Sequence, residues 1–182
     1  MYSRVQKEGT LTIRTPTPSP LAPHGSTQRY RDRIYDDPRH DPYQAKGKFA
    51  EPVVCSGCKA VYQHGRWAWG AAPEGARAAE CPACHRIRDR QPAGYVTLSG
   101  DLTGGDRDTL VRLVRNVEEH ENSEHPLHRI MGIEQDAGGI RVTTTDTHLP
   151  QRIGEALRHA RKGHLEIAYG QDEYVVRVGW RK

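Results

Sequence analysis

The chain has 182 residues, of which 35% are hydrophobic and 27% charged, with 18 glycines and 12 prolines. Its mean hydropathy of −0.81 is too low for one large apolar core, so part of the chain must be unfolded or held by something other than packing. The formal charge of +4 permits a polyanionic partner without requiring one. No apolar run approaches the roughly 18 residues of a membrane span, and the N-terminus lacks the apolar stretch of a signal peptide. We therefore expect a cytoplasmic protein with no membrane partner, in which cysteines stay reduced.

Residues 1–49 are predicted to form a flexible N-terminal arm. The first 28 residues are rich in Pro, Ser and Thr and show neither helical nor strand periodicity. The remainder interleaves tyrosines with Arg29, Arg31 and Arg33, and four aspartates dilute the positive charge. Two interpretations stay open: a solvated linker, or an arm that becomes ordered on RNA as its guanidinium groups meet phosphates.

Residues 50–92 contain all four cysteines. Residues 53–55 and 60–69 have the β-branched and aromatic composition of short strands, with a turn at 63–65. Cys55 and Cys58 form one C-x-x-C pair, and Cys81 and Cys84 form another after 22 intervening residues. Two such turns facing each other would place four thiolates around one Zn²⁺. The sequence therefore predicts a zinc ribbon with one structural zinc ion per chain.

Other uses of the cysteines are less favoured. A redox motif would consist of one C-x-x-C pair that opens a helix after a strand, and it does not predict a second pair. Disulfides conflict with the expected compartment, whereas an iron–sulfur cluster with four cysteine ligands stays possible. Gly57 and Lys59 suit a knuckle turn that points backbone N–H groups at sulfur. His85 could replace a cysteine, but four thiols make this unnecessary.

Residues 93–182 show regular periodicity and are predicted to form an α+β domain of the ferredoxin-like type. Strands are expected at 94–100, 127–135, 139–145, 164–170 and 173–180, and amphipathic helices at 105–121 and 148–163. Asp146 or Thr147 can cap the second helix. The resulting β-α-β-β-α-β order carries an extra C-terminal strand. No nucleophile–base pair or phosphate loop is present, so neither an enzyme nor a small-molecule substrate is expected.

Basic residues after the last cysteine give the candidate nucleic-acid site. Arg86, Arg88 and Arg90 alternate with other residues, and on a strand they would share one face. Three like charges on one face repel each other, and a phosphate backbone would relieve that repulsion. Trp67 and Trp69 could stack on bases, although we expect at least one of them to lie inside the ribbon.

Taken together, the two C-x-x-C pairs, residues 86–100, residues 138–157 and the ending at 174–181 resemble the N-terminal half of the large-ribosomal-subunit nuclear export adaptor family. The resemblance is to a compact bacterial or archaeal type and covers residues 51–182. It implies a zinc role for the four cysteines and contact with the large ribosomal subunit, through RNA and ribosomal protein. Members of the family typically carry more cysteine pairs and further domains, so only ribosome or RNA contact carries over.

The sequence thus predicts a non-enzymatic zinc-ribbon protein that binds RNA. The large ribosomal subunit is the first candidate for that RNA. The alternative is a zinc-dependent protein–protein adaptor or regulator with no direct contact to nucleic acid. Salt dependence separates the two, because a phosphate-driven complex weakens steeply as salt rises.

Overall fold

The structure is a computed structural model that describes residues 41–44, 49–170 and 174–182. Residues 37–182 belong to one compact unit. The segment predicted to be flexible, 1–28, lies outside the described residues, as do Arg29, Arg31 and Arg33. Among the described residues, no helix combines the length and apolar character needed to cross a bilayer.

The cysteine-containing segment forms a small four-stranded sheet in the order β3-β2-β1-β4. Its strands are β1 (Val53–Cys55), β2 (Val61–Gln63), β3 (Arg66–Ala68) and β4 (Arg77–Ala79). As predicted, β2 and β3 form a hairpin, and the Glu51 carboxylate accepts hydrogen bonds from the backbone N–H groups of the turn at His64 and Gly65. The strands of this sheet have three residues each, so backbone pairing can contribute little to its stability.

The small sheet has only a small apolar core, with Val53 and Val61 as its buried valines. The buried cluster beside it consists of Cys55, Ala60, Cys81 and Ala83, with Trp67 and Leu127 packed against it. Two of its four buried members are cysteines, and the other two are alanines, which bury little surface. At about 25 cal/mol per Å² of apolar surface, such a cluster is too small to hold a fold. Something other than packing must therefore stabilise this part of the chain.

The segment that carries Arg86, Arg88 and Arg90 is a helix, and its prediction as a strand was wrong. Helix α2 spans Pro82–Asp89, with Cys81 as its N-cap and Arg90 as its C-cap in the left-handed region at φ 55°. Proline at the first helical position has the φ that a helix needs. The arginines alternate with other residues as side chains on a strand do. The N-cap at Cys81 and the proline after it nevertheless favour a helix.

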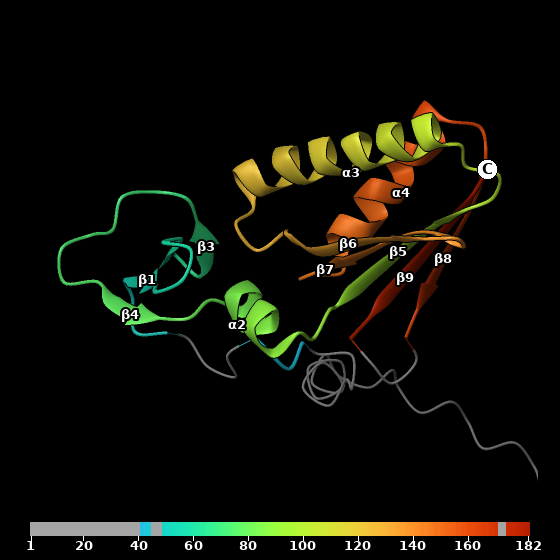
Figure 1. Cartoon of the computed structure of the whole chain (residues 1–182). Helices are drawn as coiled ribbons and strands as arrows, with labels where there is room; N and C mark the ends of the chain where they lie inside the picture. Colours follow the sequence, from blue (N-terminus) through green and yellow to red (C-terminus); the bar gives the residue numbers. More distant parts are fainter. Residues whose placement is uncertain (1–40, 45–48, 171–173) are drawn as a thin grey trace, which may run out of the picture. The chain divides into compact units, whose positions relative to one another are not determined.

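The second sheet has five strands in the order β6-β7-β5-β9-β8. In chain order its elements are β5 (Gly94–Ser99), α3 (Gly104–Glu124), β6 (Ile130–Asp136), β7 (Gly139–Thr144), α4 (His148–Ala160), β8 (His164–Tyr169) and β9 (Val176–Arg181). Helices α3 and α4 lie together on one side of this sheet (Figure 1). The core between them includes Val96, Leu98, Val142, Ile153 and Trp180.

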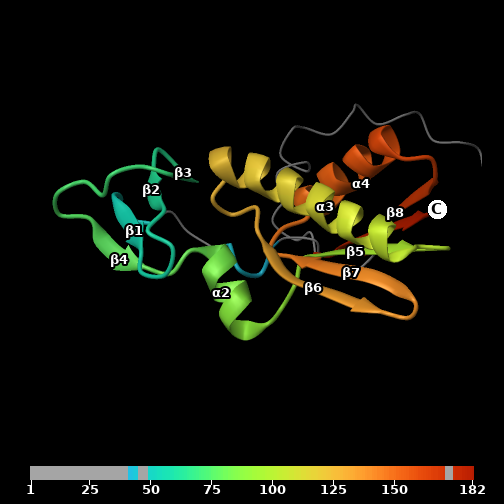
Figure 2. The same ribbon diagram turned by 45° about the horizontal axis from the view of Figure 1, so that its top comes forward.

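The order of elements along the chain matches the prediction, but the strand order in the sheet differs from a ferredoxin-like domain. In that arrangement the strand after the second helix would pair directly with the first strand. Here β9 lies between them, parallel to β5 and antiparallel to β8. The extra C-terminal strand is therefore inserted into the sheet, and Figure 2 shows β5, β6 and β7 from a second angle.

Both long helices begin at side chains that cap them. Thr103 and Asp106 form a capping box at the start of α3. Of the two residues predicted to cap α4, Asp146 does so: its Oδ1 accepts hydrogen bonds from the backbone N–H groups of His148 at 2.6 Å and Leu149 at 2.8 Å. Thr147 occupies the N-cap position without a capping side-chain bond, and its hydroxyl instead donates to the Tyr174 hydroxyl at 3.3 Å.

Candidate metal centre

The four cysteine sulfurs converge on one point. All four Sγ atoms lie within 4.8 Å of one another. Two of the separations, Cys55 Sγ to Cys84 Sγ and Cys58 Sγ to Cys81 Sγ, are 3.7 Å. A disulfide requires about 2.05 Å between sulfurs, and all four cysteines are free. The predicted grouping of the two C-x-x-C pairs is confirmed, and the group could hold a metal ion.

The first pair sits in a tight turn after β1. The Cys55 N–H donates to the Ala60 carbonyl at 2.7 Å, and the Lys59 N–H donates to the Cys55 carbonyl at 3.0 Å. Lys59 takes a left-handed conformation with φ 68°. Inside this turn the backbone N–H of Cys58 points at Cys55 Sγ at 3.5 Å. The turn thus directs both thiols of the pair to one side, as predicted.

Gly57 is required in this turn because the second pair comes close to it. A Cβ atom at position 57 would lie 2.9 Å from Cys84 Sγ and 3.4 Å from Cys84 Cβ. Carbon and sulfur at 2.9 Å overlap, so a larger residue would push the sulfur out of the group. Glycine allows the backbone of one pair to pack against the sulfur of the other.

The second pair opens helix α2. The Cys81 side chain accepts a hydrogen bond from the Cys84 N–H at 3.4 Å, so the thiol acts as the helix cap. The Cys81 N–H points at Cys55 Sγ at 3.3 Å. A C-x-x-C pair at a helix start after a strand is also the setting of redox motifs, but here it faces a second pair of thiols. The positive end of the helix dipole favours thiolates at this position.

The local environment shifts the pKa of Cys55 in one direction and the pKa values of Cys81 and Cys84 in the other. Burial opposes ionisation of Cys55, yet the N–H groups of Cys58 and Cys81 lower its pKa to about 6. Burial raises the pKa of Cys81 above its ordinary value, and the neighbouring thiolates add to that increase. Burial also raises the pKa of Cys84, although Arg129 works against it. A metal ion that binds here must therefore displace the protons of Cys81 and Cys84.

Arg129 brings a positive charge to the sulfur group. Its Nη2 donates to Cys81 Sγ at 3.3 Å and to Cys84 Sγ at 3.4 Å. Burial tends to lower the pKa of Arg129, but the hydrogen bond to Cys84 and the nearby thiolates raise it above its usual range. A site with four thiolates and a divalent ion carries two net negative charges, and a partly buried guanidinium compensates one of them.

The segment that carries Arg129 is fixed by the second sheet. Arg129 Nε donates to the Pro126 carbonyl at 2.9 Å. Its backbone N–H donates to Thr145 Oγ1 at 3.0 Å, and the Thr145 N–H donates to the Arg129 carbonyl. Leu127 packs against the cysteine cluster from the same segment. The link between α3 and β6 therefore supplies part of the wall of the metal centre. Reasoning from the sequence missed Arg129 entirely.

The predicted ribbon tryptophans have different environments. Trp67 packs against the cysteine cluster and lies 5.4 Å from the Tyr62 ring, centroid to centroid, which confirms that at least one of the two is inside. Trp69 is 42% exposed, and its indole N–H donates to the Asn122 carbonyl near the end of α3.

Arg86 is not part of an exposed cationic face. It is 3% exposed and forms an ion pair with Asp41. Its Nη1 donates to the Gln91 carbonyl at 3.1 Å, and its guanidinium lies over the Tyr43 ring, 4.3 Å from the centroid. These contacts fasten residues 41–43 to α2, so Arg86 has a structural role here.

Arg88 and Arg90 project from the exposed side of α2. Arg88 forms ion pairs with Glu80 and with Asp89, which reduces the charge it can offer to a phosphate. Arg90 is exposed at the end of the helix. The three arginines do not share a face: Arg86 is buried and Arg88 is exposed, and Arg90 lies beyond the last helical residue in the left-handed region, so it does not continue the helical row from Arg86.

None of the histidines in the described ranges belongs to the cysteine group. His85 bonds Asp89 at 3.1 Å and packs edge-on against Tyr43, so it is a neighbour of the site, as predicted. His125, His128 and His148 lie against one another, and His128 Nδ1 is 3.3 Å from Glu121. Within the described ranges, the four cysteines are the only cluster of His, Cys, Asp or Glu side chains close enough together to hold a metal ion.

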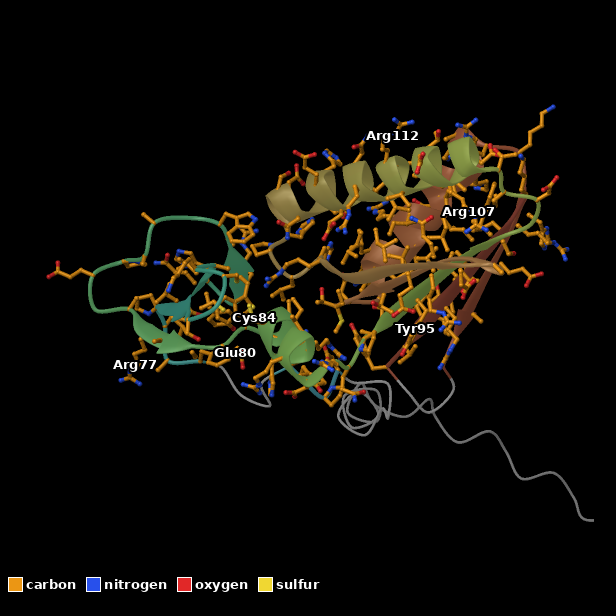
Figure 3. The ribbon with its side chains drawn as sticks, in the orientation of Figure 1. Arg77, Glu80, Cys84, Tyr95, Arg107 and Arg112 are labelled. Atoms are coloured by element: carbon orange, nitrogen blue, oxygen red, sulfur yellow. The ribbon has the colours of Figure 1, made fainter. Side chains whose placement is uncertain are left out.

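Figure 3 labels Cys84, in the first turn of α2, and Glu80, just before the helix. Comparison of the sequence with protein-family models, with curated proteins and with solved structures finds no match. The resemblance to the export adaptor family stays a prediction that rests on the cysteine pairs and the segments after them.

Proposed function

We propose that the four cysteines bind one structural Zn²⁺ per chain. The observation that carries this proposal is the separation of the sulfurs. With Zn–S bonds of about 2.3 Å, the edge of a tetrahedron is about 3.8 Å, and two pairs of sulfurs already lie at 3.7 Å. All four atoms lie within 4.8 Å, which leaves room for one ion and little room for a cluster of several irons and sulfides.

The ion would act in folding, and we propose no catalytic role for it. Four thiolates fill a tetrahedral site, so no position stays open for water or substrate. The small sheet has only a few buried apolar side chains, and the free energy of metal binding would take the place of a core. Arg129 would offset part of the negative charge of the loaded site.

We further propose that the protein binds RNA, with the ribosome as the first candidate. The net charge of +4 is compatible with a polyanionic partner, and the family resemblance is what favours RNA. The face first predicted for this contact, on Arg86, Arg88 and Arg90, is not supported, because Arg86 is buried and Arg88 is paired. The contact would then come from another surface or from Arg29, Arg31 and Arg33, which lie outside the described residues.

The metal proposal is tested by elemental analysis of the protein purified without added metal, followed by chelation. We expect one zinc per chain, and loss of near-ultraviolet signal from the ribbon tryptophans on chelation while the second sheet keeps much of its structure. Iron with visible absorbance, or a folded protein with no metal, would overturn the assignment.

The RNA proposal is tested by pull-down from cytosol with and without ribonuclease, and by co-sedimentation with ribosomes across salt concentrations. We expect ribonuclease to abolish recovery of the partners and rising salt to weaken the complex steeply. Capture of proteins that survives both treatments would favour the protein–protein adaptor.

A further inference from the structure

The five-stranded sheet has one face covered by helices and one face that neither α3 nor α4 covers. Along β5, Val96 and Leu98 are buried while Thr97 is exposed, so alternate residues point away from the helices. Figure 3 shows Tyr95 on the side of the sheet away from Arg112 of α3. We call this side the open face. Its residues on the three central strands are Tyr95, Thr97, Ser99, Arg141, Thr143, Arg177, Gly179 and Arg181.

We infer that the open face binds single-stranded RNA, with Tyr95 as a stacking platform for a base. This inference rests on the RNA-binding function proposed above and gives it a location. Tyr95 lies on the central strand of the sheet. Its neighbours across the pairing register are Thr143 on β7 and Arg177 on β9. The Arg177 guanidinium lies 5.7 Å from the centre of the Tyr95 ring, so an aromatic ring and a cation occur side by side.

The next row of the open face leaves the backbone accessible. Thr97 is paired with Arg141 on one side and with Gly179 on the other. A Cβ atom built at Gly179 would meet no atom within 4 Å. A ribose or base could therefore approach the β9 backbone closely at this point. The third row adds the Ser99 hydroxyl beside Arg181.

Charge on the open face complements a phosphate chain. The three central strands present three arginines there and no acidic residue. The acids lie on the outer strands: Glu134 faces Arg141 across the β6–β7 register, and Glu166 bonds His164 at 3.1 Å. The positive charge thus runs along the middle of the sheet, where a strand of RNA would cross it.

The composition of the open face favours a single strand of nucleic acid over other partners. Apart from Tyr95, the central residues are threonines, serine, glycine and arginines, so the aliphatic and aromatic anchors of a protein interface are missing from this part of the described chain. A duplex hides the faces of its bases, and Tyr95 could not stack on them. Hydroxyl groups at positions 97, 99 and 143 suit the 2′-OH groups of RNA.

The central experiment measures binding of a fluorescent 12-nucleotide RNA of mixed sequence by anisotropy, using the full zinc-loaded chain. Tyr95→Ala should weaken binding about 5- to 150-fold, the range for loss of one stacked base. Tyr169→Ala is the matched control, because Tyr169 is 63% exposed but bonds Gln151 on the helix side. The control should bind as the wild type does.

A second pair of variants tests the open face by steric block and charge. Gly179→Glu places an acid in the centre of the face, where a side chain meets open space, and should reduce affinity at least tenfold. Gly70→Glu makes the same change in charge at another glycine with nothing within 4 Å and should have little effect. Arg181→Gln should lower the slope of log affinity against log salt by about one, whereas Arg158→Gln on α4 should not.

Zinc content and the thermal midpoint establish that each variant is folded; if Gly179→Glu fails to fold, Tyr95→Ala and Arg181→Gln still decide. If the wild type binds RNA and the open-face variants bind as their controls do, the location is wrong while the proposed function stands. If the wild type binds no RNA, both fail. Equal binding of a duplex, or of single-stranded DNA, would overturn the single-stranded or the RNA part of the inference.

Discussion

Replacement of Arg129 by methionine should weaken metal binding without changing the ligands. Arg129 makes two hydrogen bonds to cysteine sulfurs, at 3.3 and 3.4 Å, and methionine keeps a stem of similar length without charge or donors. Loss of such outer partners typically costs about 10- to 100-fold in metal affinity, which corresponds to about 1.4–2.7 kcal/mol. Two hydrogen bonds to charged sulfur, at about 1.5–3 kcal/mol each, set an upper limit well above this range.

We expect a loss of metal affinity near the lower end of this range, about tenfold, because Arg129 is only partly buried. Removing it also removes the cost of keeping a guanidinium away from water, which offsets part of the loss. Arg129→Lys should be intermediate, since it keeps the charge but cannot place one planar group against two sulfurs. Arg158→Gln is the control for net charge, because Arg158 is an exposed residue on α4.

The assay is competition with a chromophoric zinc chelator at fixed pH, and it gives the ratio of dissociation constants between variant and wild type. Cobalt substitution provides an independent readout, because the absorption of tetrahedral cobalt–thiolate sites reports the ligands. We expect an unchanged cobalt spectrum and a dissociation constant raised at least tenfold in Arg129→Met. Affinity within twofold of the wild type would refute a role for Arg129 in compensating the charge of the site, and an altered spectrum would show that the ligands themselves had moved.

Three further predictions follow from local geometry. Gly57→Ala should lower zinc affinity in the same competition assay, because its Cβ would lie 2.9 Å from Cys84 Sγ; unchanged affinity would show that the turn can yield. Asp146→Ala should lower the free energy of unfolding in urea by about 1 kcal/mol through loss of the α4 cap, and Asp146→Asn should retain most of it; equal losses would contradict the capping role. The Lys182 ammonium and Thr103 lower the pKa of Asp106 to about 2. Its stabilising effect should therefore be present above about pH 4 and lost as pH falls toward 2. Denaturation midpoints across this window should converge with those of Asp106→Asn at the acid end, and a constant difference would contradict the assignment.

The sequence indicates the candidate metal ligands because thiol pairs at C-x-x-C spacing form a local pattern. It also predicts the order of elements in 93–182, where apolar residues recur with clear helical or strand periodicity. The position of β9 between β5 and β8 could not be predicted, since periodicity describes which face of a strand is buried and says nothing about its neighbours. The misassigned arginines illustrate the same limit, because R-I-R-D-R alternates as a strand does.

Arg129 shows what a local pattern cannot contain. It lies 45 residues from Cys84 in the chain, after a helix and before a strand, in a segment with no motif. Thr145, which directly follows β7, holds the backbone of Arg129 in place by two hydrogen bonds, one to its N–H and one to its carbonyl. A charged residue that contacts a site far away in the sequence can be identified only from the folded structure.

The two sheets differ in what stabilises them, and this difference decides how loss of metal should spread. The second sheet has an apolar core that includes Leu98, Ile153 and Trp180, which is large enough to persist without the ion. Under the proposed zinc role the small sheet depends on the sulfur group, and that group contacts Arg129 and Leu127 in the link that leads into the second sheet. Removal of zinc should therefore release the small sheet and loosen residues 126–129 first, because these residues pack against the cysteine cluster. The strands that form the open face lie beyond this segment and are held by the apolar core.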